Sequence, residues 1–356
     1  AGDLVSRQGG DEFIIVMSDL HSCNPAIRLA DQILKIFANP FILDEESVYI
    51  SASIGISFYP QDYDNTAALL KASDQAMYAA KALGKNTFHC FTQSMQDAAV
   101  HRMQLIKDLH KGIQEQQFQL FYQPIISLES GELHKAEALI RWNHPVDGLV
   151  PPDKFIPVAE ETKLITKIGD WVFDEGINSL TQLRDVFGQE FQLSINASPV
   201  QFTDPSSNIL EWHNQINHHD IDGASFVIEI TEGLLMEAGD ESLSALLSFR
   251  DAGIEVALDD FGTGYSSLSY IQEYDIDYLK IDREFVKNLP ESDDSYVLCE
   301  SIIVMAHKLG IKVIAEGIET DAQKEALVAM GCDFGQGYLF SKPIPLDEFT
   351  KLPKSF

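Results

Sequence analysis

The stretch VALDDFGTGY, residues 256–265, decides the plan of this chain. Its first three residues predict a short buried strand, which ends on two adjacent carboxylates, Asp259 and Asp260. A turn bracketed by glycines follows at once, and this order is typical of charge presented at the mouth of a sheet or barrel. Because adjacent carboxylates repel each other, the pair needs a cation, a shared proton or full solvation.

The same strand pattern recurs through the part of the chain after residue 117. Short apolar strands are predicted at residues 120–126, 134–142, 191–197, 226–231, 255–260, 278–282, 312–315 and 338–340. Helical patterns lie between most of them, for example at residues 169–186, 241–252, 296–309 and 322–330. This alternation predicts an α/β fold, a (β/α)8 TIM-like barrel. A doubly wound open sheet is the competing architecture, but no GxGxxG motif opens a helix after the first strand.

Polar residues gather at one end of the predicted strands. They are Glu137, Asn196, Glu229, Glu232, Asp259, Asp260, Lys280, Asp282, Glu316, Glu319 and Gln336. One acid after a strand is usually a helix cap, but five successive strands that end this way favour a site at the carboxyl-terminal rim of a barrel.

The ligand types in this set are hard oxygen donors, without histidine or cysteine. They suit Mg²⁺ or Mn²⁺ better than Zn²⁺. One ion would leave much of the negative charge uncompensated, whereas two ions are a common device for phosphodiester hydrolysis. Lys280 either offsets this charge and steers the attacking water, or is an inward-facing barrel lysine paired with a carboxylate.

Composition narrows the class of protein. The chain has 356 residues, which predicts two domains or one large barrel with an appendage. Its net charge of −30 argues against a non-specific binder of nucleic-acid polymers or anionic membranes. Four scattered cysteines predict a reduced, cytoplasmic compartment, and the chain lacks an apolar run long enough for a membrane segment.

The first segment predicts a small α/β unit. RQGGDEF, residues 7–13, indicates a tight hairpin, followed by a helix at 25–38, a strand at 48–58 and a helix at 67–83. Residues 92–116 carry apolar side chains on one helical face, which predicts a linker helix; a regulatory lever is the sharper alternative.

Three motifs of this segment resemble a known family. RQGGDEF, SASIGIS (51–57) and ASDQAMYAAKALGKN (72–86) resemble the C-terminal half of a GGDEF (diguanylate cyclase) domain, over about residues 1–92. The family's N-terminal half, with its nucleotide phosphate loop, is not in this chain, so we expect no cyclase activity from it. GTP is expected only at a complete GGDEF domain in a longer parent protein, which an upstream region would tether to a membrane.

The barrel region resembles the EAL family of cyclic-di-GMP phosphodiesterases. The resemblance rests on EAL (137–139) with Arg141-Trp142, Asn196, EITE (229–232), DDFGTGYSSL (259–268), YLKID (278–282), AEGIE (315–319) and QGY (336–338). It implies a modified TIM barrel with one antiparallel strand. The predicted domains are 1–92 (partial GGDEF), 93–112 (linker helix) and 113–356 (EAL barrel).

The resemblance also implies roles for single residues. The implied metal ligands are Glu137, Asn196, Glu229, Asp259, Asp260 and Glu316, with Asp259 shared by two ions. The implied catalytic residues are Lys280, which contacts the nucleophilic water, Glu316, a candidate general base, and Glu232, which anchors the loop 261–268 that couples metal binding to dimerisation. The implied substrate contacts are Gln123, Leu139, Arg141, Asp260 and Gln336, and Glu319 supports metal or water together with Gln336.

The expected function is therefore metal-dependent hydrolysis of cyclic di-GMP to linear pGpG by two Mg²⁺ or Mn²⁺ ions, in a homodimer formed through the barrel. The alternative is a catalytically weak cyclic-di-GMP receptor regulated by the GGDEF segment. Two positions depart from the family pattern: Lys163 stands where glycine is expected, and Gly233 where serine is frequent.

Overall fold

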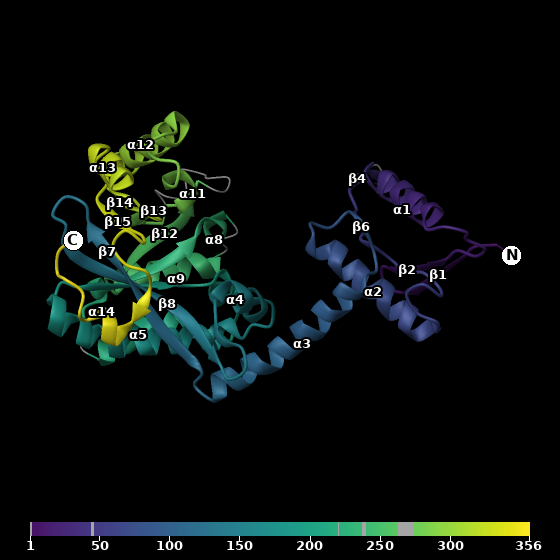
Figure 1. Cartoon of the computed structure of the whole chain (residues 1–356), viewed down its shortest axis with the longest axis horizontal. Helices are drawn as coiled ribbons and strands as arrows, with labels where there is room; N and C mark the ends of the chain where they lie inside the picture. Colours follow the sequence, from purple (N-terminus) through teal and green to yellow (C-terminus); the bar gives the residue numbers. More distant parts are fainter. Residues whose placement is uncertain (1, 44–45, 220, 237–239, 263–273) are drawn as a thin grey trace. The chain divides into compact units, whose positions relative to one another are not determined.

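The computed structural model describes residues 2–43, 46–219, 221–236, 240–262 and 274–356. The chain divides into two compact units, Ala1–Leu105 and Ile106–Phe356 (Figure 1). Helix α3 (Gln93–Gln114) begins in the first unit and ends in the second. It confirms the helix predicted at 92–116; the domain boundaries and the lever function remain predictions.

In its described residues, the first unit contains three separate two-stranded sheets, two complete helices and the start of α3. Its elements are β1 (Leu4–Gly9), β2 (Glu12–Val16), α1 (Asn24–Phe37), β3 (Phe41–Leu43), β4 (Glu46–Val48), β5 (Ile54–Ile56), α2 (Thr66–Ala82) and β6 (Phe88–Cys90). The predicted hairpin is confirmed, because β1 and β2 pair antiparallel with Gly9 opposite Glu12. The two predicted helices are also confirmed, as α1 and α2.

The single strand predicted at residues 48–58 is wrong in extent. Two short strands cover this stretch: β4 pairs with β3, and β5 pairs with β6. Helix α2 lies directly against β5, since a Cβ on Gly55 would come within 1.8 Å of the Ser73 carbonyl oxygen. This close approach explains why a glycine interrupts the apolar pattern.

The second unit is a closed barrel. Its strands are β7 (Phe118–Ser127), β8 (Leu133–His144), β10 (Gln192–Asn196), β11 (Phe226–Thr231), β12 (Glu255–Phe261), β13 (Tyr278–Ile281), β14 (Lys312–Ala315) and β15 (Phe334–Gln336). They pair in the order β7-β15-β14-β13-β12-β11-β10-β8, and β8 pairs back to β7. Strand β7 runs antiparallel to both of its neighbours, and the other pairs of the ring are parallel. The predicted barrel is confirmed, and the open sheet is excluded.

The eighth strand was predicted at the wrong position. Residues 338–340 form a turn, and the strand is β15, four residues earlier. Gly335 in β15 is closely packed, because a Cβ there would lie 2.6 Å from Ile318 Cδ1 and 2.9 Å from Leu128 Cδ2. The packing of β15 therefore requires a glycine at position 335.

Helices surround these strands (Figure 1). They are α4 (Pro152–Glu161), α5 (Ile165–Phe187), α6 (Pro199–Thr203), α7 (Trp212–His218), α8 (Glu232–Met236), α9 (Asp240–Asp251), α11 (Arg283–Val286), α12 (Asp293–Lys308), α13 (Asp321–Ala329) and α14 (Leu346–Phe349). Two short strands, β9 (Gly148–Val150) and β16 (Ile344–Pro345), extend the sheet. In the described ranges, the helices are too short or too polar to cross a membrane.

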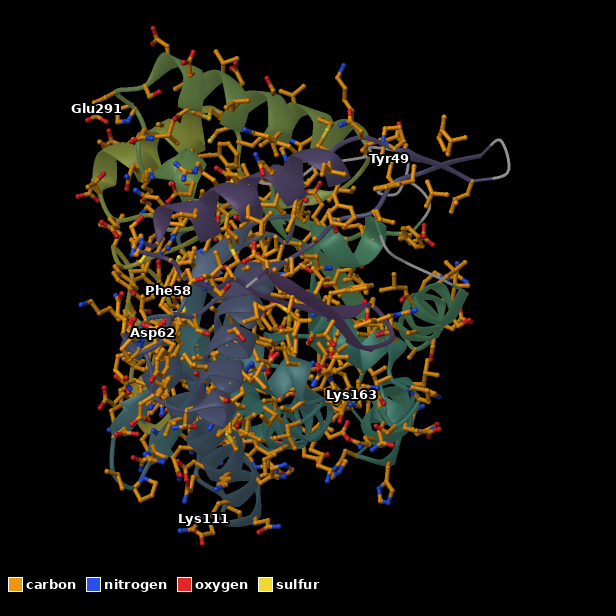
Figure 2. All side chains as sticks on the ribbon, turned by 90° about the vertical axis from the view of Figure 1, so that its right-hand side faces the viewer. Tyr49, Phe58, Asp62, Lys111, Lys163 and Glu291 are labelled. Carbon is orange, nitrogen blue, oxygen red and sulfur yellow. The ribbon has the colours of Figure 1, made fainter. Side chains whose placement is uncertain are left out.

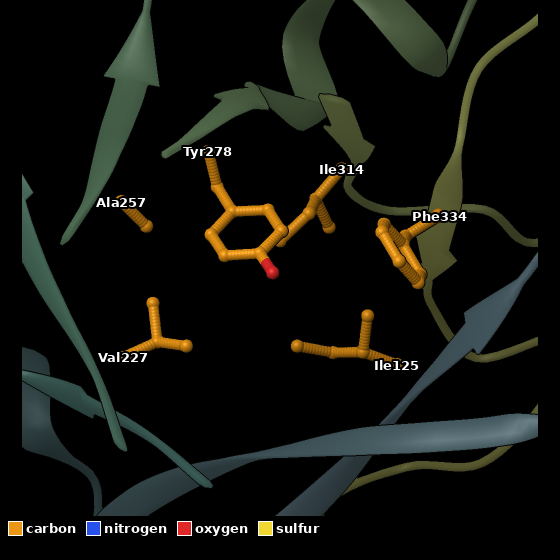
Figure 3. Close-up of a cluster of buried hydrophobic side chains, with 6 residues drawn as sticks. All are labelled: Ile125, Val227, Ala257, Tyr278, Ile314 and Phe334. Carbon is orange, nitrogen blue, oxygen red and sulfur yellow. The ribbon is translucent and has the colours of Figure 1, made fainter. Parts of the chain in front are cut away.

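One layer of apolar side chains fills the barrel interior. It consists of Ile125, Val227, Ala257, Tyr278, Ile314 and Phe334, one from each of six strands (Figure 3). All six are at most 8% exposed. Since alternate residues of a strand point to the same face, the residues two positions away from this layer also point into the barrel.

Candidate active site

The candidate site is the next layer of inward-facing side chains, at the carboxyl ends of the parallel strands. Two residues beyond the six apolar residues stand Gln123, Glu229, Asp259, Lys280, Glu316 and Gln336. Strand β7 supplies Gln123 from the opposite chain direction, and the strand register places it directly across from Glu137 of β8. The side-chain period of the strands therefore brings these predicted residues to one place.

Lys280 is the centre of this layer. Its Nζ lies 2.5 Å from Glu229 Oε2, 2.7 Å from Glu316 Oε1 and 3.2 Å from Asp259 Oδ1. Glu137 Oε2 lies further away, at 3.7 Å. The lysine side chain is 1% exposed, so these charges interact in a setting with little water. The pairing with carboxylates that the sequence left as an alternative is present, and it does not exclude a contact with water or substrate.

Two amides hold the carboxylate of Glu137. Asn196 Nδ2 donates to Oε1 and Gln336 Nε2 donates to Oε2, both at 2.6 Å. Gln336 Nε2 also donates to Gln123 Oε1 at 3.0 Å, and Gln123 Nε2 donates to the Ser341 carbonyl oxygen at 3.2 Å. These contacts orient Glu137 before any ligand is bound. The Ser341 carbonyl is a contact that no sequence signal would have revealed.

Asp259, Asp260 and Glu316 form a second group at the edge of this layer. Each of them offers one oxygen atom, and these atoms lie within 4.8 Å of one another. Asp260 has a φ of 55°, and the pairing of β12 with β13 shifts register between Leu258 and Phe261. The irregularity breaks the strand alternation, which lets two adjacent aspartates contribute to one site.

The pKa shifts follow from burial and from the density of negative charge. Burial and the neighbouring Glu137 raise the pKa of Glu229 well above its usual range. Burial also raises the pKa of Glu316 to about 7, although Lys280 opposes the shift. Burial would lower the pKa of Lys280, but the four surrounding carboxylates raise it well above its usual range.

The donor set suits divalent cations. Lys280 supplies one positive charge among five carboxylates, those of Glu137, Glu229, Asp259, Asp260 and Glu316. Glu229 Oε1 and Gln336 Oε1 are buried and have no hydrogen-bond partner within the described residues. Oxygen atoms that are buried without partners, beside excess negative charge, are what hard cations such as Mg²⁺ or Mn²⁺ coordinate.

Other predicted residues lie around this layer. Leu139 and Arg141 follow Glu137 on the same face of β8; Arg141 is half-buried, and its guanidinium lies 5.6 Å from the ring centroid of Phe121. Glu232 is buried at the start of α8, and neither of its carboxylate oxygens has a hydrogen-bond partner in the described part of the chain. Its predicted target, the loop 261–268, lies outside the described residues from 263 onward.

Two acids of the predicted rim, Asp282 and Glu319, have surroundings unlike those of the inward-facing acids. Asp282 caps α11, because its Oδ1 accepts a hydrogen bond from the Glu284 backbone N–H at 2.8 Å, so the capping explanation is correct at this position. Glu319 has an exposed side chain, and its backbone N–H donates to Gln323 Oε1 at 2.8 Å. The support role of Glu319 remains a prediction.

The chain is similar to proteins with the same domain pair. Residues 106–343 match the EAL domain model, and residues 1–87 match the model of the diguanylate cyclase GGDEF domain. Over 98% of its length, the chain is 36% identical to the bifunctional diguanylate cyclase/cyclic di-GMP phosphodiesterase MucR and 35% identical to the cyclic di-GMP phosphodiesterase NbdA, both of Pseudomonas aeruginosa. It covers 50% and 45% of these two proteins, so it spans about half the length of the relatives it matches.

Solved structures give the same result. The PaMucR phosphodiesterase in its c-di-GMP complex is 35% identical, with a TM-score of 0.65 over 69% of this chain and 99% of that one. The EAL enzyme Bd1971, with cAMP and cyclic di-GMP bound, is 29% identical, with a TM-score of 0.69 over 95% of this chain and 80% of that one. With its EAL match, its barrel and its inward-facing layer of acids, the chain belongs to the EAL domain family, and a GGDEF-matching segment precedes its barrel.

Proposed function

We propose that this chain hydrolyses cyclic di-GMP to linear pGpG, with two Mg²⁺ or Mn²⁺ ions in each active site. The observation that carries the proposal is the ring of buried and half-buried carboxylates around Lys280, two of which, Asp259 and Glu316, also form a group with Asp260. This density of oxygen ligands is far greater than one ammonium group can neutralise. Related proteins named as cyclic di-GMP phosphodiesterases support the choice of substrate.

The ligands would divide into two overlapping sets. Glu137, Asn196, Glu229 and Asp259 would hold one ion, and Asp259, Asp260 and Glu316 would hold the other. When bound, the ions would lower the pKa of a water molecule and supply positive charge next to the phosphodiester. The amides of Asn196 and Gln336 already hold both oxygen atoms of Glu137, so this carboxylate is oriented in advance.

The chain's own residues would do the rest of the chemistry. Lys280 holds Glu229 and Glu316 in place and would contact the attacking water. Glu316, with its pKa raised to about 7 in the metal-free protein, is the proposed proton acceptor. At the outer end of β8, the guanidinium of Arg141 suits one phosphate, and Gln123, Leu139, Asp260 and Gln336 would line the rest of the substrate path.

Turnover of cyclic di-GMP tests the proposal directly. The chain is incubated with cyclic di-GMP and Mg²⁺ or Mn²⁺, with EDTA in a parallel sample, and the products are separated by chromatography. We expect pGpG in the metal samples and unchanged substrate with EDTA. A correctly folded, dimeric sample that gives no product contradicts the proposal. Tight binding of cyclic di-GMP in EDTA without product would instead support the receptor alternative.

The finer expectations are separate proposals, supported by the resemblance alone. We propose a homodimer formed through the barrel, with Glu232 anchoring the loop 261–268, and GTP as a ligand of a complete GGDEF domain in the parent protein. We also propose a cytoplasmic location. Sedimentation analysis tests the dimer. The GTP proposal is tested by comparing hydrolysis with and without GTP, in this chain and in the longer parent.

A further inference from the structure

Lys163 occupies a backbone conformation that favours glycine. It lies in the corner between α4 and α5, with a φ of 60°. A lysine in this left-handed region is strained relative to glycine, and the resemblance to the EAL family predicts glycine here. The side chain of Lys163 is therefore expected to make a compensating contact.

That contact is an ion pair with Asp204. Lys163 Nζ lies 2.7 Å from Asp204 Oδ2; the lysine side chain is 66% exposed, whereas the aspartate side chain is 5% exposed. Lys163 is labelled in Figure 2. Asp204 Oδ1 accepts two hydrogen bonds from Ser206, from its backbone N–H at 2.8 Å and from its hydroxyl at 2.7 Å. The carboxylate thus has a fixed orientation, and Lys163 supplies its charge partner.

The same corner also holds the other end of α6. Asp204 is the C-cap of α6 and Ser198 is its N-cap. The Ser198 hydroxyl donates to Glu160 Oε1, at the end of α4, at 2.7 Å. Between the two caps, the buried Gln201 lies so close to Gly169 of α5 that a Cβ on this glycine would be 2.2 Å from Gln201 Nε2. Both ends of α6 are therefore tied to the α4–α5 corner.

This helix begins directly after a predicted metal ligand. Asn196 ends β10, and Ser198 is only two residues further on. The side chain of Asn196 is exposed and donates to Glu137 Oε1 at 2.6 Å, while the Ala197 N–H donates to the Glu229 carbonyl oxygen at 2.9 Å. The backbone of Asn196 is held by β11 and leads directly into α6, so a shift of α6 would reach its exposed amide.

We propose that Lys163 and Asp204 form a positioning pair: their contact fixes α6 and thereby keeps the Asn196 amide in place beside Glu137 for metal binding. The inference rests on the proposed function, because it assigns Asn196 to the metal site. Neither Lys163 nor Asp204 touches the reacting atoms, so both act through Asn196. Glycine would adopt this left-handed backbone conformation without strain, whereas Lys163 adopts it with strain and makes an ion pair.

The test measures metal binding without turnover. Lys163→Gly and Asp204→Asn are compared with the wild type by calorimetric titration of the metal-free protein with Mn²⁺. Each substitution is expected to weaken Mn²⁺ binding about threefold to tenfold, less than the loss of a direct partner of a ligand. The double variant should bind Mn²⁺ no more weakly than either single variant, since both substitutions remove the same contact. Lys163→Arg keeps the pair and should retain the affinity.

Thermal unfolding in EDTA separates positioning from a general loss of stability. Lys163→Gly removes the backbone strain together with the ion pair, so its Tm should stay at or above that of the wild type. The matched control is Lys154→Ala, because Lys154 lies 3.7 Å from Asp153 in an exposed pair of α4 and should leave both Tm and Mn²⁺ affinity unchanged.

Wild-type Mn²⁺ affinity in Lys163→Gly overturns the inference, and so does a loss of affinity that follows a fall in Tm. If Asp204→Asn fails to fold, Lys163→Gly still decides the result. Turnover of cyclic di-GMP is measured in parallel for the wild type and for Lys163→Gly. In Lys163→Gly, kcat should fall by a larger factor than KM rises. If the wild type gives no product but Lys163→Gly still weakens Mn²⁺ binding, the proposed function fails while the positioning pair stands.

Discussion

Lys280 Nζ lies 2.5 Å from Glu229 Oε2, and both side chains are at most 1% exposed. An ion pair buried this deeply costs much of its Coulomb energy in desolvation, but breaking it leaves a charge without a partner. Burial and the neighbouring Glu137 already raise the pKa of Glu229, so its charged form depends on a nearby positive charge. The pair therefore links the stability of the barrel interior to whatever cation occupies the site.

Substitution of this lysine tests the link. Lys280→Met should lower the free energy of unfolding in EDTA by about 3–5 kcal/mol, because Glu229 is left without its ammonium partner. Mn²⁺ should restore part of this loss, and turnover should fall about a hundredfold or more. Urea unfolding at neutral pH, with EDTA and with Mn²⁺, measures both effects. The control is Lys308→Met on the exposed side of α12. Equal stability of Lys280→Met and the wild type in EDTA would contradict the argument.

Loss of a metal ligand should end catalysis. Glu137→Ala and Asp259→Asn are each expected to abolish turnover of cyclic di-GMP, since each removes a charged ligand. Chelation should have the same effect on the wild type and should be reversed by added Mn²⁺. Initial rates, together with circular dichroism to check folding, give the answer. Glu325→Gln, on the exposed side of α13, should keep full activity. Substantial residual activity in either ligand variant would show that the ligands are wrongly assigned.

Lys135 should make stability depend on pH. It is fully buried at the level of the apolar layer, opposite Ile125 in the pairing of β7 with β8, and its Nζ lies 3.3 Å from the ring centroid of Tyr278 without a hydrogen-bond partner among the described residues. Burial lowers its pKa from 10.5 to about 7. Above pH 7 the unfolded chain therefore binds more protons at this residue than the folded protein does, and the free energy of unfolding rises with pH. The destabilisation caused by burying Lys135 is thus greatest below pH 7 and declines as the pH rises.

The size of this effect can be measured against a variant. Lys135→Met should be more stable than the wild type near pH 6, and the gap should narrow by about 2–3 kcal/mol by pH 9. The difference between the two unfolding curves cancels the other titrating groups. A gap that is constant between pH 6 and pH 9 would show that Lys135 stays protonated in the folded protein.

Two glycines should respond oppositely to the same substitution. A Cβ on Gly112 of α3 would lie 2.9 Å from Trp142 Nε1, which donates to Gln117 Oε1 at 3.1 Å. Gly112→Ala should therefore destabilise the barrel unit by about 1–3 kcal/mol through overpacking. A Cβ on Gly233 of α8 would meet no atom of the described residues within 4 Å. Gly233→Ala should stabilise the protein by about 0.5–1 kcal/mol through helix propensity. Thermal unfolding of both variants settles the comparison, and two changes of the same sign would refute it.

Much of the architecture followed from the sequence. Apolar strands that end on Asn196, Glu229 and Asp259 predicted the barrel and the end of it that carries the site, because the period of a strand is local. The hairpin at residues 9–12 was also predictable, since its turn depends on neighbouring glycines. Local patterns failed where close packing decided the structure, as at Gly335 and Gly55, which packing requires inside strands.

The arrangement within the site was decided by the tertiary structure. The sequence showed acids at strand ends but could not separate the cap Asp282 from Asp260, which joins the site only because the strand alternation breaks between Leu258 and Phe261. It left two interpretations of Lys280, and only closure of the barrel brings Glu137, Glu229 and Glu316 around its ammonium group. These contacts join residues 36 to 143 positions apart and so depend on the whole fold, whereas the type and order of the side chains were already present in the sequence.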